Sequence, residues 1–86
     1  MRLPLRKLKS LPKYKPISGE KVIKILCNKF DFAVTGRKGS HVRLSKETKD
    51  GKIGTVVPLH KELKLGTLRG ALRLAKISID EFYKQL

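Results

Sequence analysis

Apolar residues recur every three or four positions along SGEKVIKILCNKF, the spacing expected for one face of a helix. Ser18 opens this segment with a side chain favoured at helix N-caps, and Glu20 lies where the helix dipole favours a carboxylate. The pattern therefore predicts an amphipathic helix of about three turns. Its apolar face is expected to comprise Val22, Ile23, Leu26 and Phe30.

After this helix the apolar residues alternate with polar ones, which is typical of strands with one buried face. Gly36 and Gly39 bracket a predicted turn between two such segments, so the segments are expected to pair as a hairpin. The positions expected on the buried face are Phe30, Phe32 and Val34 in the first strand and Val42 and Leu44 in the second.

A third strand is predicted over IGTVVP, after the turn signal KETKDGK. Pro58 ends it because proline has no N–H to donate to a strand ladder.

Helical spacing returns in the remainder of the chain, where Thr67 is a candidate cap for a second helix. Ser78 and Glu81 have the spacing of a capping box, which predicts a short last helix. The expected buried positions are Leu68, Ala71, Leu72 and Ala75 in the longer helix and Ile79, Phe82 and Leu86 in the short one.

This order of elements predicts an α+β domain, α-β-β-β-α with a short extra C-terminal helix. The helices are expected to cover one face of a three-stranded antiparallel sheet and to leave the other face in water. A chain of 86 residues has room for one such domain, assigned to residues 18–86.

Charge narrows the class of partner. Lys and Arg number 21 against 7 Asp and Glu, a formal net charge of +14, which favours polyanions such as nucleic acid and opposes self-association. An acidic protein would neutralise the same surface, so a protein partner stays open as well.

Residues 1–17 form a predicted basic arm, because they contain six basic residues, no acidic residue and three prolines. The arm is either a solubilising tail or a segment that follows phosphates or wraps a partner. Its possible anchors are Leu3, Leu5, Leu8, Leu11 and Tyr14.

Cys27 is the only cysteine, so the chain has no internal disulfide, and the residue is interpreted as a small helix hydrophobe. The apolar runs are far shorter than the ~20 residues that span a bilayer, and no signal peptide is apparent. A cytoplasmic protein without membrane contact is expected.

His41 is the first candidate for chemistry, because alternation with Val42 and Leu44 turns it, with Arg43, toward the open face. An imidazole can take or give a proton near neutral pH, and neighbouring cations attract phosphate. In RNA such a group can deprotonate the 2′-OH for attack on the adjacent phosphorus. A strand histidine among arginines is more often a binding or solvated residue, so the pattern alone leaves both roles open.

His60 is a second candidate, near the start of the next helix, where Lys61, Lys64 and the amides around Thr67 can hold a phosphate. A loop histidine bonded to backbone is an equally good interpretation. No metal or other cofactor is expected, because the two histidines and scattered carboxylates lack the spacing of a metal site.

The segments GRKGSHVRL and TVVPLHKELKLGTLRGALRLAKIS, followed by DEF, closely resemble the HicA toxin family of small mRNA interferases. The resemblance covers residues 18–86 and implies a fold like that of double-stranded-RNA-binding domains. It also implies ribosome-independent cleavage of mRNA and a cognate antitoxin, HicB, that masks the site.

The family's essential histidine falls on His41, and its second motif histidine falls on His60, which we assign to positioning or RNA contact. The expected enzyme is a metal-independent endoribonuclease. The alternatives are a non-catalytic double-stranded-RNA-binding module and a purely structural subunit of a repressor assembly. The residues expected to bind RNA are Arg37, Lys38, Gly39, Ser40, Arg43, His60, Lys61, Lys64 and Thr67.

Overall fold

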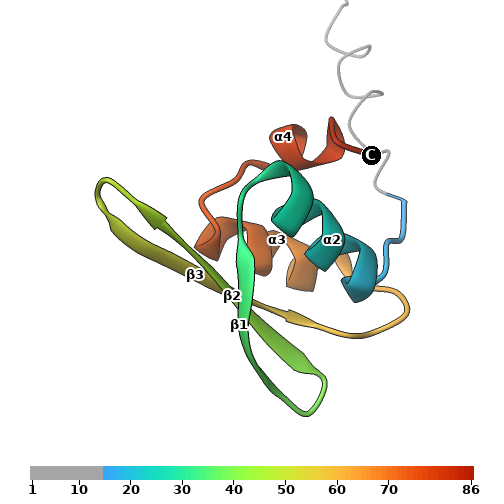
Figure 1. The fold of residues 1–86 in the computed structure, drawn as a ribbon. Helices are drawn as coiled ribbons and strands as arrows, with labels where there is room; N and C mark the ends of the chain where they lie inside the picture. Colours follow the sequence, from blue (N-terminus) through green and yellow to red (C-terminus); the bar gives the residue numbers. More distant parts are fainter. Residues whose placement is uncertain (1–14) are drawn as a thin grey trace, which may run out of the picture.

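The computed structural model describes residues 15–86. Three strands in the order β1-β2-β3 form one antiparallel sheet, and the helices gather on one side of it (Figure 1). This arrangement confirms the predicted α-β-β-β-α fold with an added C-terminal helix. The elements are α2 (Gly19–Lys29), β1 (Ala33–Lys38), β2 (His41–Thr48), β3 (Gly51–Pro58), α3 (Leu65–Leu74) and α4 (Ile79–Tyr83).

The arm predicted over residues 1–17 lies largely outside the described residues, as do all five of its possible anchors. Its last residue, Ile17, is buried in the core. The Leu63 N–H donates to the Ile17 carbonyl at 2.9 Å, which joins this segment to the link between β3 and α3.

Two of the three predicted helix caps are confirmed. The Ser18 hydroxyl accepts from the Lys21 N–H at 3.1 Å, and Ser78 and Glu81 form a complete capping box. The predicted cap at Thr67 is wrong: α3 begins two residues earlier and has no side-chain cap. Thr67 therefore lies inside the first turn of α3, whereas a capping residue must precede the first turn, at the position that Lys64 occupies.

The core lies between the sheet and the helices. It includes the predicted helix positions Val22 and Leu26, and the short last helix contributes Phe82. The predicted burial of Leu86 is wrong: this residue lies beyond the last residue of α4, Tyr83, and is 55% exposed. The core also buries Ile25, Leu63 and Ile77, together with the predicted residues Leu68, Ala71, Leu72 and Ala75.

The predicted start of the first strand is wrong. Phe30 is the C-cap of α2, Phe32 is buried before the strand begins, and Val34 is 53% exposed. The reason is the chain reversal at Asp31, whose φ of +61° takes the backbone out of the helix, so that β1 starts only at Ala33. Continuous alternation across FDFAV therefore does not occur.

The β2–β3 connection is shorter than predicted from KETKDGK. Thr48 and Gly51 pair directly, which leaves Lys49 and Asp50 as the turn. The Thr48 hydroxyl donates to the Gly51 carbonyl at 2.7 Å and accepts from the Asp50 N–H at 3.1 Å. This side chain closes the hairpin, so polar residues that looked like a loop extend both strands.

Thr55 joins the sheet to α3. Its hydroxyl is buried and donates to the Ala71 carbonyl at 2.7 Å, and that carbonyl also accepts from the Ala75 N–H.

We expect Thr55→Val to lower the free energy of unfolding by about 1 kcal/mol, because the shape of the side chain is kept and one buried hydrogen bond is removed. Urea unfolding checks this, with the exposed Thr67→Val as control, and equal stability of both variants would contradict it.

Candidate functional site

The β1–β2 hairpin carries the first group of predicted site residues and projects beyond the helices (Figure 1). Lys38 pairs directly with His41, and Gly39 and Ser40 form the turn between them. Gly39 has a φ of +61°, a conformation that glycine adopts without strain. The prediction that Gly36 also borders the turn is wrong, because Gly36 lies within β1.

A bulge in β1 decides which cation lies beside His41. Val34 pairs with Leu44 and Gly36 pairs with Arg43, so Thr35 is an extra residue in β1. Residues directly opposite each other point to the same face of a sheet. If the register set by Val34 and Leu44 continued along β1 without a bulge, Arg37 would lie opposite His41. Because of the bulge, Lys38 lies opposite His41 instead.

Four side chains line one shallow hollow of about 340 Å³ on the open face of the sheet: Lys38, His41, Arg43 and Val56. The two cations and the imidazole are exposed. The predicted alternation of β2 is confirmed, since Val42 and Leu44 are buried on the opposite side. An anion in this hollow would meet two positive side chains and a group able to transfer a proton.

Arg37 lies apart from this hollow. Strand pairing puts it opposite Val42, and its Nε donates to the Gly39 carbonyl at 2.9 Å. The guanidinium therefore braces the turn from the other face of the hairpin. The Ser40 backbone joins this turn to the link after β3, since the Ser40 carbonyl accepts from the Leu59 N–H at 2.7 Å.

His60 lines a different hollow, together with Ser18, Glu20, Leu59 and Lys61. Its imidazole is exposed, and its backbone carbonyl accepts from the Gly19 N–H at 2.9 Å. The structure thus separates the two histidines, although the link that carries His60 is bonded to the turn that precedes His41.

Gly19 allows this link to lie directly against the start of α2. A Cβ added at Gly19 would come within 1.9 Å of the Pro58 carbonyl oxygen and 3.2 Å of the Leu59 Cα. No side chain fits there. The end of β3, which pairs with His41 through Pro58, is therefore positioned by backbone contact with a helix from the other end of the chain.

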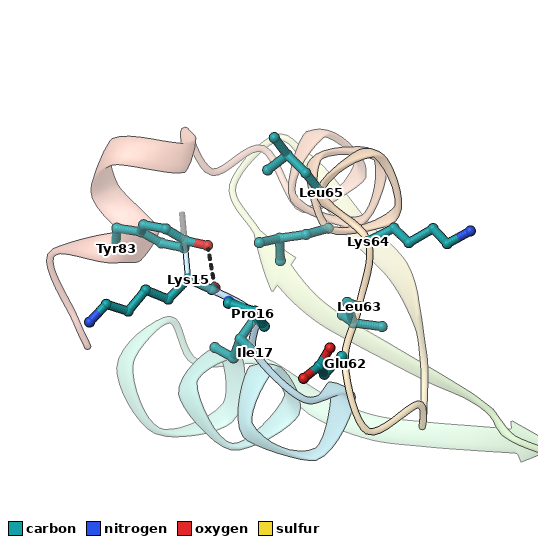
Figure 2. Close-up of a pocket in the computed structure, with 9 residues that line it drawn as sticks. Lys15, Pro16, Ile17, Glu62, Leu63, Lys64, Leu65 and Tyr83 are labelled. Atoms are coloured by element: carbon teal, nitrogen blue, oxygen red, sulfur yellow. Dashed lines mark hydrogen bonds between the residues drawn. The ribbon is translucent and has the colours of Figure 1, made fainter. Parts of the chain in front are cut away.

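The remaining predicted residues are distributed along the link and the start of α3. Lys61 is exposed in the hollow of His60, and Thr67 is exposed on the first turn of α3. Lys64 borders a third hollow, of about 320 Å³, between residues 15–17, α3 and α4 (Figure 2).

That third hollow is lined by apolar side chains and by four polar residues, Lys15, Glu62, Lys64 and Tyr83. The Tyr83 hydroxyl donates to the Lys15 carbonyl at 3.5 Å across one side of it (Figure 2). The ammonium groups of Lys15 and Lys64 extend away from it in opposite directions (Figure 2). It contains no histidine, so it offers no imidazole of the kind that His41 supplies to its own hollow.

Val56 is the site residue that sequence reasoning missed. Its β-branched side chain suits any strand, yet it is 38% exposed opposite Arg43. The signal was present in the sequence, because alternation along IGTVVP puts Val56 on the face opposite to Thr55 and Val57. The structure buries both of these neighbours.

Within residues 15–86, no group of three or more His, Cys, Asp or Glu side chains is placed to hold a metal ion. Cys27 is partly buried against the core and has a free thiol. Among the described helices, none is long and apolar enough to cross a bilayer.

Comparison with known proteins agrees with the motifs. A family model described as the HicA toxin of bacterial toxin–antitoxin systems matches residues 19–77, more than half of the chain. No curated protein is similar enough to count as a match. The matched range runs from the start of α2 to the residue before Ser78, and so includes the whole sheet and both histidines. The chain therefore belongs to the HicA toxin family of bacterial toxin–antitoxin systems.

Proposed function

We propose that this toxin is an endoribonuclease that cleaves mRNA independently of the ribosome, with His41 as its general base. One observation carries the proposal: an exposed imidazole shares a hollow with two cations, Lys38 and Arg43, on the uncovered face of the sheet. Loss of mRNA stops translation, which is how the toxin would act. An mRNA substrate also implies a cytoplasmic location.

In the proposed reaction, the neutral His41 imidazole removes the proton from a ribose 2′-OH. The 2′-oxygen attacks the adjacent phosphorus, and the bond from phosphorus to the 5′-oxygen breaks. The products are a 2′,3′-cyclic phosphate and a 5′-hydroxyl end. Lys38 and Arg43 stabilise the negative charge that builds on the phosphoryl oxygens.

The departing 5′-oxygen must also receive a proton. Lys38 is directly opposite His41 in the strand register and shares its hollow. His60 lines another hollow, which supports a role in positioning or RNA contact. We therefore assign the proton to Lys38 or to a water molecule. Lys61, Lys64 and Thr67 would contact the RNA backbone beyond the cleaved phosphate.

The antitoxin implied by the family is, in this proposal, a HicB protein that covers the hollow of His41. The charge of +14 supports an acidic contact surface on that partner. Bound antitoxin and bound RNA would then exclude each other, because both neutralise the same cations.

A second candidate is a binding module without chemistry. The α-β-β-β-α order is that of double-stranded-RNA-binding domains, which recognise A-form RNA by shape. Such a module would need the cations of the hollow and would not need an imidazole.

Cleavage of a defined single-stranded RNA by antitoxin-free protein in EDTA tests the proposal. We expect fragments with 2′,3′-cyclic phosphate or 3′-phosphate ends. A substrate with 2′-deoxyribose at the cut position should stay intact, because the nucleophile is missing. Cleavage of that substrate at the same position would contradict the mechanism, and intact RNA with folded, RNA-bound protein would favour the binding module.

A further inference from the structure

Val56 is an apolar side chain in the middle of a basic surface. Strand pairing puts it directly opposite Arg43, and both line the hollow that contains His41. Burial in the core does not account for this valine, because the core lies on the opposite face with Val57. Its methyl groups are available to a ligand.

The sheet surface around Val56 is not covered by neighbouring side chains at two positions, because both are glycines. Gly36 lies on the far side of Arg43 in the same row across the sheet, and a Cβ there would meet no atom within 4 Å. Gly54 is two residues before Val56 on β3, which puts it on the same face, and it is exposed. Two missing side chains leave room for a flat group to lie over the methyl groups and the guanidinium.

We propose that Val56 and Arg43 receive one unpaired base of the RNA, next to the phosphate held at Lys38 and His41. Base faces pack on apolar and guanidinium surfaces, and such contacts tolerate different bases. The faces of a base inside an A-form duplex are covered by its stacked neighbours. The site therefore requires a single-stranded nucleotide, although the fold resembles domains that read duplexes.

This inference deepens the proposed function and rests on it for the position of the cleaved phosphate. Its test is a binding measurement on short single-stranded RNAs made uncleavable by 2′-deoxyribose at the cut position. One series is intact, and a matched series has a single abasic residue moved along the chain. The proteins are wild type, Val56→Ala, Val56→Phe and the control Leu74→Ala, an exposed leucine on α3.

We expect Val56→Ala to weaken binding of the intact RNA about fivefold, because alanine offers the base less apolar surface than valine does. Val56→Phe should tighten that binding, because an aromatic ring stacks better on a base. Both effects should vanish when the abasic residue is at one position beside the cut, and Leu74→Ala should change neither series. A matching duplex should bind wild type and Val56→Ala equally.

The inference is overturned if Val56→Ala weakens intact and abasic RNAs by the same factor at every abasic position, or if binding to the duplex shows the same dependence. Failure of the proposed function looks different: wild type then leaves cleavable RNA intact. In that case the abasic series, scanned along the whole oligonucleotide, still decides whether Val56 contacts a base. Absence of any RNA binding by wild type would overturn both.

Discussion

His41→Gln is expected to lower kcat for RNA cleavage by about 10²- to 10⁴-fold, the usual contribution of a positioned general base. Glutamine keeps a polar side chain of similar reach but cannot take the 2′-OH proton at neutral pH. KM should change little, because Lys38 and Arg43 still attract the phosphate. His41 is exposed at the end of a strand, so thermal unfolding should be unchanged.

The matched control is His60→Gln, which removes the other imidazole from its separate hollow. Its kcat should stay within a few-fold of wild type, with any effect appearing in KM. The measurement is steady-state cleavage of one RNA across a range of RNA concentrations, which yields kcat and KM for each variant. Wild-type rates for His41→Gln would remove His41 from its proposed role. An equally large loss of kcat for His60→Gln would contradict the assignment of His60 to positioning or RNA contact.

Gly19→Ala is expected to lower the free energy of unfolding by about 1–3 kcal/mol, the usual cost of overpacking, although alanine is the better helix former. The added Cβ would come within 1.9 Å of the Pro58 carbonyl oxygen, which is backbone and must move as a unit. For a domain of this size the melting temperature should fall by roughly 5–20 °C.

Gly70→Ala supplies the control, because an added Cβ on this α3 residue would meet no atom within 4 Å. It should be neutral or stabilise the protein by up to about 1 kcal/mol, the difference in helix propensity. Calorimetry or thermal circular dichroism compares the two variants. A Gly19→Ala protein as stable as Gly70→Ala would mean that the link around Pro58 yields without cost.

Much of the fold could be predicted because local signals agreed with one another. Alternation around Val42 and Leu44 identified the buried face of β2, and therefore the open face on which His41 lies. The capping box at Ser78 and Glu81 located a helix as short as α4. In each case the property that the sequence shows, spacing or cap chemistry, is also what stabilises the element.

The errors arose where backbone geometry competes with composition. Gly36 looked like a turn residue, and a bulge at Thr35 can be recognised only from the strand register. The choice of Lys38 over Arg37 as the neighbour of His41 follows from that bulge, so composition could not supply it. The role of Gly19 was equally out of reach, because it depends on contact with Pro58, far away in the sequence.

The hydrogen bond from the Leu59 N–H to the Ser40 carbonyl makes one amide proton a reporter for this end of the sheet. A bonded amide exchanges with solvent only when its segment opens. This proton exchanges when the link after β3 separates from the hairpin turn, an opening that would also release the backbone just before His41. The protection of the Leu59 amide from exchange therefore measures the free energy of this opening in solution, without any substrate present.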